Sequence, residues 1–295
     1  ICTLSTVSLA RLYRTSGRIP HTAIDLLENS EHGHPHRRPH FHQVLGQGEQ
    51  ACGETGDGRM LEPQELVEDV IAFFQPKSLA GHHVLVSAGP TFEAIDPVRG
   101  ITNLSSGKMG FSIARAAREA GAEVTLVAGP VHLPTPRGVQ RVDVRSALDM
   151  QAAVAQHVDA ASVFVATAAV ADWRVADVAG QKIKKDGSGQ LPQLSFVENP
   201  DILAGVAQSA RAKSGALYCV GFAAESHDLL KHATAKRERK GVPLLVGNIG
   251  PATFGLDDNA LLLVDAQGHQ ELPQASKLSL ARQLVGEIAR RLKSA

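Results

Sequence analysis

From Ser78 onward, apolar runs of strand length alternate with segments whose apolar residues recur at helical spacing. The pattern predicts strands over residues 82–87, 123–128, 139–143, 162–167, 216–221, 243–247 and 260–265. It predicts helices over residues 107–120, 146–158, 200–211, 227–240 and 275–293. Strands and helices in alternation are typical of an α/β domain.

Several of these strands are apolar throughout, as in Val163–Ala166 and Leu244–Val246. Continuous apolar strands indicate a parallel sheet that is covered on both faces. We therefore expect a Rossmann-like doubly wound, mostly parallel sheet with helices on both faces. In such a sheet a ligand binds beyond the carboxyl ends of the strands.

The chain before this domain has a different character. Residues 1–47 show no sustained helical or strand period, and we interpret them as an atypical segment, disordered or out of frame. This segment holds six of the thirteen histidines, and a His-x-His-x-His run can bind metal, although no carboxylate or cysteine pattern accompanies it. The six are His21, His32, His34, His36, His40 and His42.

Residues 48–77 form a second segment, with a glycine-rich loop around Cys52, a short amphipathic helix over residues 63–74 and a polar linker. A lone cysteine in such a loop is either a positioned reactive group or an inert residue. The domain boundary is expected at the linker, so that residues 78–295 form the main domain.

Composition narrows the function classes. The formal net charge is zero, so the whole molecule has no attraction to nucleic acid or to an anionic membrane. No apolar run reaches the roughly 20 residues of a membrane helix, and no signal peptide is visible at Ile1. The three cysteines are few and widely spaced, which favours a reducing compartment. We expect a cytoplasmic protein.

The stretch from Thr102 to Gly121 has the pattern of an anion site. A predicted strand over residues 82–87 and a turn at Gly89 precede it, and apolar residues at helical spacing follow it. Ser105 and Ser106 stand where N-caps belong, and a helix start opened by glycines exposes backbone N–H groups that can bind phosphate. The residues of this turn are Ser105, Ser106, Gly107, Lys108 and Gly110.

The turn matches neither common phosphate motif. A Walker A loop needs a glycine where this chain has Thr102, and the stretch contains no Gly-x-Gly-x-x-Gly fingerprint. A glycine-rich turn that serves only packing is the alternative interpretation.

Further candidates follow later strands. Asp172, after Ala168 and Ala169, can hold a ribose hydroxyl or a metal, or can be a turn aspartate. The run Lys182-Ile183-Lys184-Lys185 can place cations over a triphosphate, or can be a solvated basic loop.

The next helix is expected to have its N-cap near Asn199 and Pro200 in its first turn. Phe222 ends a strand and can cover a base. Lys236 and Lys240 are one turn apart on a helix, and such a like-charge pair costs roughly 0.2–0.5 kcal/mol unless a bound phosphate relieves it. Together, the lysines and the anion-binding turn favour a nucleoside triphosphate.

The chain from Val84 to about Leu263 resembles a known family, the phosphopantothenoylcysteine synthetase domain of the bacterial bifunctional phosphopantothenoylcysteine decarboxylase/phosphopantothenate–cysteine ligase. The motifs that carry the resemblance are Ser-Ala-Gly-Pro-Thr (87–91), Asp-Pro-Val-Arg (96–99), Ser-Ser-Gly-Lys-Met-Gly (105–110), Ala-Ala-Val-Ala-Asp (168–172), Lys-Ile-Lys-Lys (182–185), Asn-Pro-Asp-Ile (199–202) and Gly-Phe-Ala-Ala-Glu (221–225). The segment around Cys52 resembles the end of the fused decarboxylase domain.

The resemblance implies a ligase. It would activate 4′-phosphopantothenate with CTP, in the presence of Mg²⁺, to an acyl-cytidylate and pyrophosphate, and cysteine would then displace CMP. By the same resemblance Lys182 serves the activation step, Asn103 serves the second step, and Asp172 with the phosphates is the candidate Mg²⁺ site. The nucleotide-binding residues would be Gly89, Ser105, Ser106, Gly107, Lys108, Gly110, Ala168, Ala169, Asp172, Lys182, Pro200, Asp201, Ile202, Leu203, Phe222, Lys236 and Lys240.

The chain departs from the family in its first part. Residues 1–47 contain no flavin-binding sheet, catalytic histidine or Pro-x-Met-Asn clamp. Cys52, the decarboxylase proton donor by resemblance, is therefore expected to be orphaned, and FMN is expected only in a longer parent protein. The family also implies a homodimer through the synthetase domain.

Two other functions stay open on the sequence. A Rossmann-like sheet alone allows an NAD(P)-dependent oxidoreductase, and the atypical first segment allows an inactive ligase fragment that acts as an interaction module. The choice between CTP and ATP does not follow from residue types, because it depends on the loop from Ala168 to Asp172.

Overall fold

A computed structural model describes residues 45–49, 55–60, 62–184, 192–225, 227–249 and 255–293. Residues 1–44, including the six clustered histidines, and Cys52 and Lys185 lie outside the described residues. The chain divides into two compact units, and the boundary falls between Gln75 and Pro76. Each unit is described by itself.

The first unit contains the antiparallel strands β1 (Leu45–Glu49) and β2 (Thr55–Met60) and the helix α3 (Pro63–Phe74). The helix was predicted, and a capping box between Glu62 and Glu65 with proline at its first position explains where it begins. The strands were not predicted, because glycines interrupt them and no apolar alternation is present.

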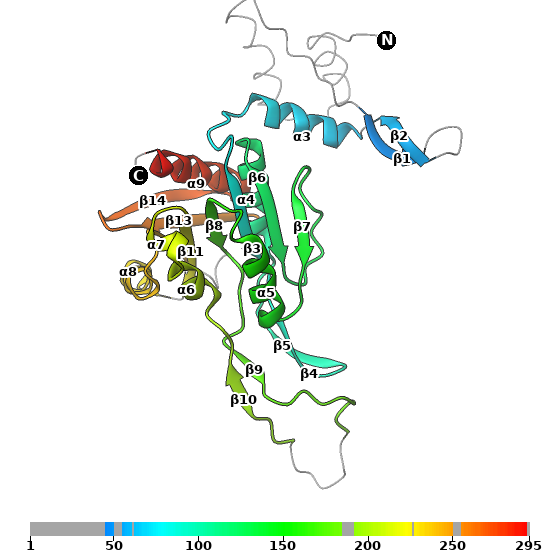
Figure 1. The fold of residues 1–295 in the computed structure, drawn as a ribbon, viewed down its shortest axis with the longest axis vertical. Helices are drawn as coiled ribbons and strands as arrows, with labels where there is room; N and C mark the ends of the chain where they lie inside the picture. Colours follow the sequence, from blue (N-terminus) through cyan, green and yellow to red (C-terminus); the bar gives the residue numbers. More distant parts are fainter. Residues whose placement is uncertain are drawn as a thin grey trace, which may run out of the picture. The chain divides into compact units, whose positions relative to one another are not determined.

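The second unit is built on an eight-stranded sheet with the order β14-β13-β12-β11-β8-β3-β6-β7 (Figure 1). The neighbours from β12 to β7 are parallel, while β13 and β14 are antiparallel additions at one edge. The strands are β3 (His83–Ala88), β6 (Glu123–Ala128), β7 (Gln140–Asp143), β8 (Val163–Ala166), β11 (Tyr218–Glu225), β12 (Leu244–Ile249), β13 (Asp258–Val264) and β14 (His269–Ser276).

Helices cover both faces of this sheet. An apolar cluster on one face joins Ile113 of α4 to Leu284 of α9. A second cluster on the other face includes Met150 of α5, Leu203 of α6 and Ala233 of α8. The doubly wound, mostly parallel α/β fold is thereby confirmed. The helices are α4 (Lys108–Glu119), α5 (Ala147–His157), α6 (Ile202–Ala207), α7 (Ala210–Lys213), α8 (Leu229–Lys240) and α9 (Lys277–Leu292).

The strand order creates one switch point. The chain winds from β3 toward β7 in one direction, then returns to β8 beside β3 and winds toward β12 in the other. The loops that leave β3 and β8 therefore diverge over opposite faces, and the space between them is where this type of sheet binds ligands.

The structure differs from the prediction in one helix and in one edge strand of the main sheet. The predicted helix over residues 200–211 is two short helices, because the Ser209 hydroxyl accepts a hydrogen bond from the Ala212 N–H at 3.2 Å and caps a new helix. Strand β14 was missed because Pro273 interrupts its pattern, which an edge strand tolerates.

Two small hairpins outside the main sheet were also missed. They are β4 (Phe92–Asp96) with β5 (Arg99–Thr102), and β9 (Trp173–Val175) with β10 (Phe196–Glu198). β4 contacts β9, so the hairpins lie together, and Figure 1 shows them at one end of the sheet. We refer to these four strands, together with residues 97–98, 176–184 and 192–195, as the hairpin lobe. Strands this short give too few alternating positions for a sequence pattern.

Among the described residues, no helix has the length and apolar character that crossing a membrane requires.

A buried carboxylate joins α4 to α9. Glu119 is 4% exposed and accepts hydrogen bonds from Arg115 Nε at 3.0 Å and from Arg282 Nε at 2.7 Å. Burial by itself raises the pKa of Glu119, but the hydrogen bonds and charges of Arg282 and Arg115 outweigh it and the net pKa is lowered. The charged form is therefore the one that the folded state stabilises.

We expect Glu119→Gln to lower the free energy of unfolding by about 1.5–3 kcal/mol at pH 7, because two charge-assisted hydrogen-bond partners lose their carboxylate. A carboxyl pKa that is lowered on folding stabilises the protein above the unfolded pKa, and this contribution disappears as the pH falls through the folded pKa. The difference from the unsubstituted chain should therefore shrink below pH 4.5, the ordinary value. Urea unfolding followed by circular dichroism measures it. Glu123→Gln, on an exposed side chain of β6, is the control, and equal losses from both substitutions would refute the role of Glu119.

Candidate functional site

A cavity of about 730 Å³ lies beyond the carboxyl ends of the parallel strands. Its walls include Ser87 of β3, Ala166 of β8, Phe222 of β11 and Asn248 of β12. The volume is in the range of small-molecule sites. The site is therefore where the sequence predicted it, at the switch point of the sheet.

The loops after β3 and β8 are bonded to each other across this switch point. The Ala169 N–H donates to the Gly89 carbonyl at 2.9 Å, and the Thr91 N–H donates back to the Ala169 carbonyl at 3.2 Å. The buried hydroxyl of Thr91 accepts from the Ala171 N–H at 3.0 Å. These bonds fix the backbone of one cavity wall independently of any ligand.

Helix α4 begins at this wall. Its N-cap is Gly107 in a left-handed conformation with φ 74°, and no side chain caps the helix. The expectation that Ser105 or Ser106 is the N-cap was wrong: the Ser105 hydroxyl only accepts a 3.4 Å bond from the Gly107 N–H. Because Gly107, Lys108 and Gly110 line the cavity, the uncapped first turn offers backbone N–H groups to an anion.

Gly110 also has a packing role. A Cβ at this position would overlap the Ala88 Cβ and the Thr167 hydroxyl. The helix therefore approaches β3 and β8 more closely than any other residue would allow. The packing interpretation therefore holds for Gly110, while anion binding at the turn of Gly107 stays a prediction.

Lys108 lines the cavity, but its ammonium already has partners. Its Nζ lies 2.7 Å from the Asp257 carboxylate and donates to the Gly255 carbonyl at 2.9 Å. The sequence had suggested a full positive charge for the anion site. The structure instead shows that the Asp257 carboxylate partly neutralises the charge of Lys108.

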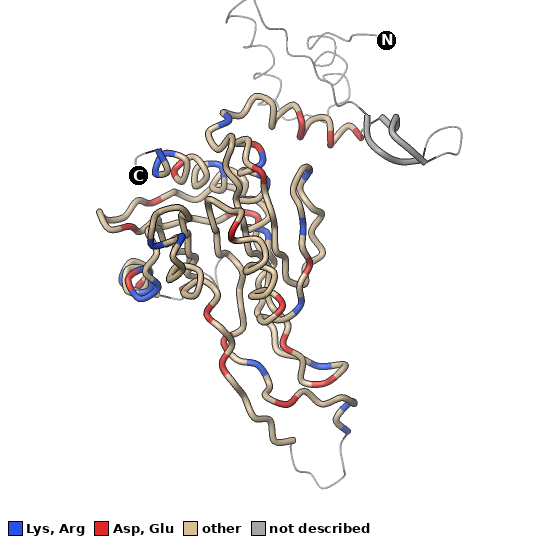
Figure 2. Tube along the Cα trace, viewed as in Figure 1, with Lys and Arg blue, Asp and Glu red and all other residues tan. Residues whose placement is uncertain are grey.

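Helix α8 supplies the basic side chains of another wall; Figure 2 shows the charges along the chain. Lys240 forms an ion pair with Asp201, which relieves part of the repulsion expected between Lys240 and Lys236. Burial lowers the pKa of Lys236, with Lys240 adding to the shift and Glu225 opposing it. An anion in the cavity would therefore stabilise the charged form of Lys236.

Asp201 has a second role, as the residue that caps the start of α6. It is the N-cap of α6, and its carboxylate accepts from the Ala204 N–H at 3.0 Å. The N-cap thus lies two residues after Asn199, and Pro200 precedes the helix, although it was predicted in the first turn. Asn199 instead donates to the Ala171 carbonyl at 2.8 Å and holds the loop that carries Asp172.

Asn103 lies at the edge of the cavity. Its Nδ2 donates to the Ala169 carbonyl at 2.9 Å, so the amide group is oriented by the bonded wall described above. Its Oδ1 belongs to an exposed side chain beside the uncapped start of α4. A neutral amide in this place can hold a polar group of a ligand next to a bound anion.

Most of the predicted site residues meet in this cavity. Those that line it are Asn103, Ser105, Ser106, Gly107, Lys108, Gly110, Ala168, Ala169, Asp172, Pro200, Asp201, Ile202, Leu203, Phe222, Lys236 and Lys240. Gly89 and Lys182 are not among the lining residues. Gly89 serves the turn after β3, with φ 77°.

Lys182 belongs to the hairpin lobe. The next residue, Ile183, donates its N–H to the Asp96 carboxylate at 3.1 Å, and its carbonyl accepts from Arg99 at 2.9 Å. Hydrogen bonds from Arg99, Val98 and Ile183 hold the pKa of Asp96 well below its usual range. The Asp-Pro-Val-Arg motif therefore anchors the segment of Lys182, and the Lys182 side chain is exposed.

The polar residues that line the cavity and were missed from the sequence include Asn248, Asn259 and Lys277. Lys277 is 7% exposed, and burial and the nearby Lys108 lower its pKa. A signal for it did exist, because a lysine in the first turn of a helix opposes the helix dipole unless an anion lies nearby. Asn248 and Asn259 carry no such signal, since they lie within apolar strands.

The chain is similar to proteins described as coenzyme A biosynthesis bifunctional protein CoaBC. The protein from Vibrio cholerae serotype O1 is 51% identical over 237 residues, which cover 79% of this chain and 59% of that protein. The protein from Escherichia coli strain K12 is 47% identical over 249 residues, which cover 83% of this chain and 61% of that protein. This chain thus spans about three-fifths of the length of these relatives.

A solved structure and a family model agree with these relatives. The crystal structure of the C-terminal domain of coenzyme A biosynthesis bifunctional protein CoaBC matches with a TM-score of 0.63 at 35% identity, over 74% of this chain and 100% of that one. The resemblance found in the motifs is confirmed. Residues 79–292 match the family described as DNA/pantothenate metabolism flavoprotein C-terminal domain, and the chain belongs to that family.

Proposed function

We propose that this chain is a phosphopantothenate–cysteine ligase of coenzyme A biosynthesis. It activates 4′-phosphopantothenate with CTP to an acyl-cytidylate and then couples cysteine to give 4′-phosphopantothenoylcysteine. The observation that carries the proposal is the position of Asn103 beside the uncapped start of α4 in a cavity with basic walls. Membership of the family supports it.

The first step is a displacement at phosphorus. A carboxylate oxygen of 4′-phosphopantothenate attacks the α-phosphorus of CTP, the bond to the β-phosphate oxygen breaks, and pyrophosphate leaves. The carboxylate is a weak nucleophile, so catalysis depends on neutralising the charge of the phosphates. The N–H groups of α4 together with Lys236 and Lys277 are the cavity groups suited to this task.

The second step is an acyl transfer. The amine of cysteine attacks the acyl carbon, the bond to the CMP oxygen breaks, and the amine loses a proton. Asn103 can donate to the oxygen on which charge develops, and because its amide is neutral it does not hold the amine as a salt. The nucleotide leaves along the wall formed by Phe222, Lys236 and Lys240.

Mg²⁺ fits the same cavity. Asp172 lines it and offers a carboxylate, and Mg²⁺ typically binds through one or two carboxylates together with substrate phosphates. The ion would supply further charge neutralisation at the phosphates. Asp172 is held in place through its backbone, since its carbonyl accepts from the Asn199 N–H at 2.8 Å.

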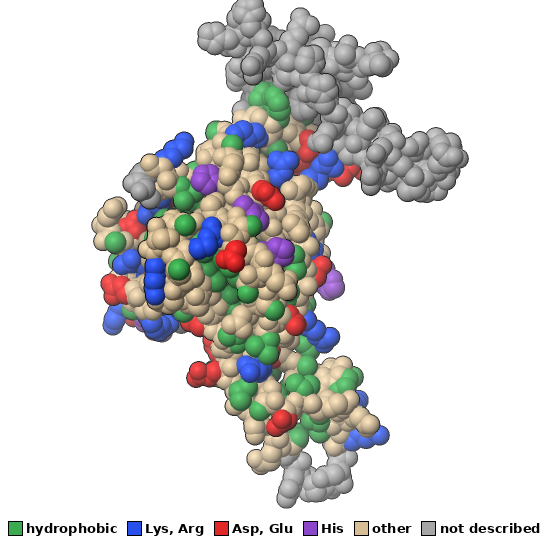
Figure 3. All heavy atoms as spheres, in the orientation of Figure 1, with side chains coloured by type: hydrophobic (Ala, Val, Ile, Leu, Met, Phe, Trp, Pro, Cys, Tyr) green, Lys and Arg blue, Asp and Glu red, His purple; other side chains and the backbone are tan. Residues whose placement is uncertain are grey.

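We also propose a homodimer that forms through the hairpin lobe. Large apolar side chains are exposed on this lobe and beside it, and Figure 3 shows apolar surface there. A second copy of the chain would remove these side chains from water. Lys182 is on the same lobe and does not line the cavity of its own chain. Dimer formation could therefore bring Lys182 to a nucleotide bound in the cavity of the second copy. The exposed side chains are Val98, Leu104, Trp173, Phe196 and Val197.

The remaining expectations concern the longer parent protein. FMN and a decarboxylase activity belong, in this proposal, to a longer parent protein, whose decarboxylase domain would end in the segment around Cys52. The substrates imply a cytoplasmic enzyme that needs neither nucleic acid nor membrane.

One assay separates this proposal from its rivals. The ligase releases pyrophosphate only with both CTP and 4′-phosphopantothenate, and forms the amide product only when cysteine is added. An NAD(P)-dependent oxidoreductase is disfavoured because the turn before α4 lacks the dinucleotide fingerprint. A folded sample that releases no pyrophosphate would support an inactive fragment.

Asn103→Ala and Lys182→Ala should fail at different steps. We expect Asn103→Ala to release pyrophosphate and accumulate the acyl-cytidylate, because it loses only the amide that serves the second step. Lys182→Ala should lose pyrophosphate release itself. Single-turnover assays with quantification of pyrophosphate and amide product distinguish the two. Wild-type rates in both variants would refute the assigned roles.

Lys277→Met should raise the Kd for CTP about 10- to 100-fold, since one charge-assisted bond to phosphate is worth about 1.5–3 kcal/mol. The control is Lys293→Met, an exposed lysine just after the same helix. Isothermal titration calorimetry measures both. An unchanged Kd in Lys277→Met would remove this residue from the phosphate site.

Phe196→Ser should raise the dimer dissociation constant by about 10-fold or more, because burying a phenylalanine is worth about 1.5–3 kcal/mol. Leu148→Ser, at a similarly exposed position on α5, serves as the control. Sedimentation velocity over a concentration series measures the constant. Equal behaviour of the two variants would place the dimer contact elsewhere.

A further inference from the structure

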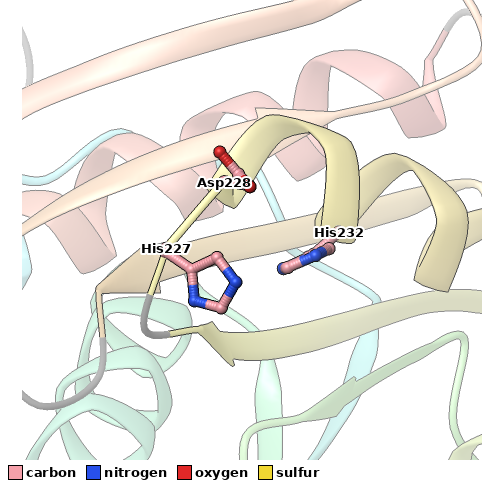
Figure 4. Close-up of side chains that lie close together, drawn as sticks. All are labelled: His227, Asp228 and His232. Atoms are coloured by element: carbon pink, nitrogen blue, oxygen red, sulfur yellow. The ribbon is translucent and has the colours of Figure 1, made fainter.

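A cluster of metal-ligating side chains lies at the turn between β11 and α8, outside the lining of the cavity. It consists of His227, Asp228 and His232 (Figure 4). One candidate ligand atom from each residue lies within 4.8 Å of the other two. The first two residues precede α8, and His232 is in its second turn.

The donor set indicates the class of ion. Two imidazole nitrogens and one carboxylate oxygen suit transition ions such as Zn²⁺, whereas Mg²⁺ prefers oxygen ligands. Ligand atoms on one Zn²⁺ lie about 3–3.5 Å apart, given bond lengths of about 2.0–2.1 Å. His227 and Asp228 are exposed, so small rotations of their side chains can close this difference.

A neighbouring carboxylate is placed to orient one of the imidazoles. Glu225, the last residue of β11, has its Oε2 3.7 Å from His232 Nδ1. Histidines that bind metal commonly donate the N–H of the other ring nitrogen to a carboxylate. The 3.7 Å separation is an ion-pair distance and not a hydrogen bond, so a small rotation of the ring would let Nδ1 donate to Glu225 and Nε2 bind the ion.

The backbone at the centre of the cluster is unusual. Asp228 has φ 46° and ψ 43°, and it is the one non-glycine residue with positive φ among the described residues. The left-handed conformation costs roughly 1–2 kcal/mol for most residues. Asp228 is also the N-cap of α8 without a side-chain capping bond. The Asp228 carboxylate therefore does not make the capping hydrogen bond to the first backbone N–H groups of α8 that an N-cap aspartate commonly makes. It lies instead within reach of both histidines.

We propose that His227, Asp228 and His232 bind a divalent transition-metal ion of the Zn²⁺ class, with Glu225 orienting His232. The ion joins the turn after β11 to the start of α8. Phe222 on β11 and Lys236 on α8 line the cavity, so the ion clamps the two elements that carry these residues. This site is separate from the proposed Mg²⁺ position at Asp172, because different residues form it. Its ligand atoms are also mainly nitrogen, whereas Mg²⁺ prefers oxygen.

The test is equilibrium dialysis of the full chain against Zn²⁺. The histidines of residues 1–44 can also bind the ion, so all proteins carry His34→Ala and His36→Ala. We expect the added double substitution His227→Ala/His232→Ala to lose one bound equivalent per chain. His269→Ala, on exposed β14, should lose none.

Two further measurements keep the outcome decisive. Asp228→Asn preserves the side-chain volume and should weaken Zn²⁺ binding at the same site, which matters if the double substitution disturbs folding as judged by circular dichroism. Co²⁺ bound in place of Zn²⁺ should show visible absorption that disappears in the His227→Ala/His232→Ala chain. Equal Zn²⁺ stoichiometry and unchanged Co²⁺ absorption in the substituted and control chains would overturn the proposal.

Discussion

The close contact of α4 with strands β3 and β8 is the constraint on which the rest of the site depends. It exists because Gly110 has no side chain to separate the helix from Ala88 and Thr167. The contact places the start of α4 directly above the switch point, where the loops after β3 and β8 are bonded to each other. An uncapped helix start in that position offers backbone N–H groups that suit an anion, before any lysine is considered.

The lysines then differ in what they can contribute. Lys108 and Lys240 have carboxylate partners in Asp257 and Asp201, whereas burial lowers the pKa of Lys236 and Lys277. Asp257 is 86% exposed, and an exposed ion pair is worth only about 0–1 kcal/mol. A polyphosphate can therefore compete for Lys108 at little cost. Lys236, which is half-buried, and Lys277, which is buried, gain more from a bound anion, since it offsets the desolvation of their charge.

The sequence predicted the parts of this protein that depend on local pattern. The central strands and long helices were found because apolar runs and helical spacing follow directly from burial on both faces of a sheet. The cavity was found because switch-point sheets place their ligands in one region. Lys277 was missed because its importance comes from a helix start that packs against residues far away in the chain. Lys182 was expected beside the nucleotide, and only the three-dimensional arrangement shows that it lies on a separate lobe.

In the hairpin lobe, a single carboxylate holds two segments that are far apart in the chain. The Asp96 carboxylate accepts bonds from the Val98 and Arg99 N–H groups at 2.9 Å, which closes the β4–β5 turn. Its other oxygen accepts from Arg99 Nε and from the Ile183 N–H, which fixes the segment of Lys182 to that turn. A single buried carboxylate therefore sets the position of a lysine that the family motif assigns to activation. Lys182 therefore stays close to its hairpin and outside the cavity lining. In the proposed ligase, its contribution to activation would depend on an assembly that brings the hairpin lobe to a nucleotide-binding cavity.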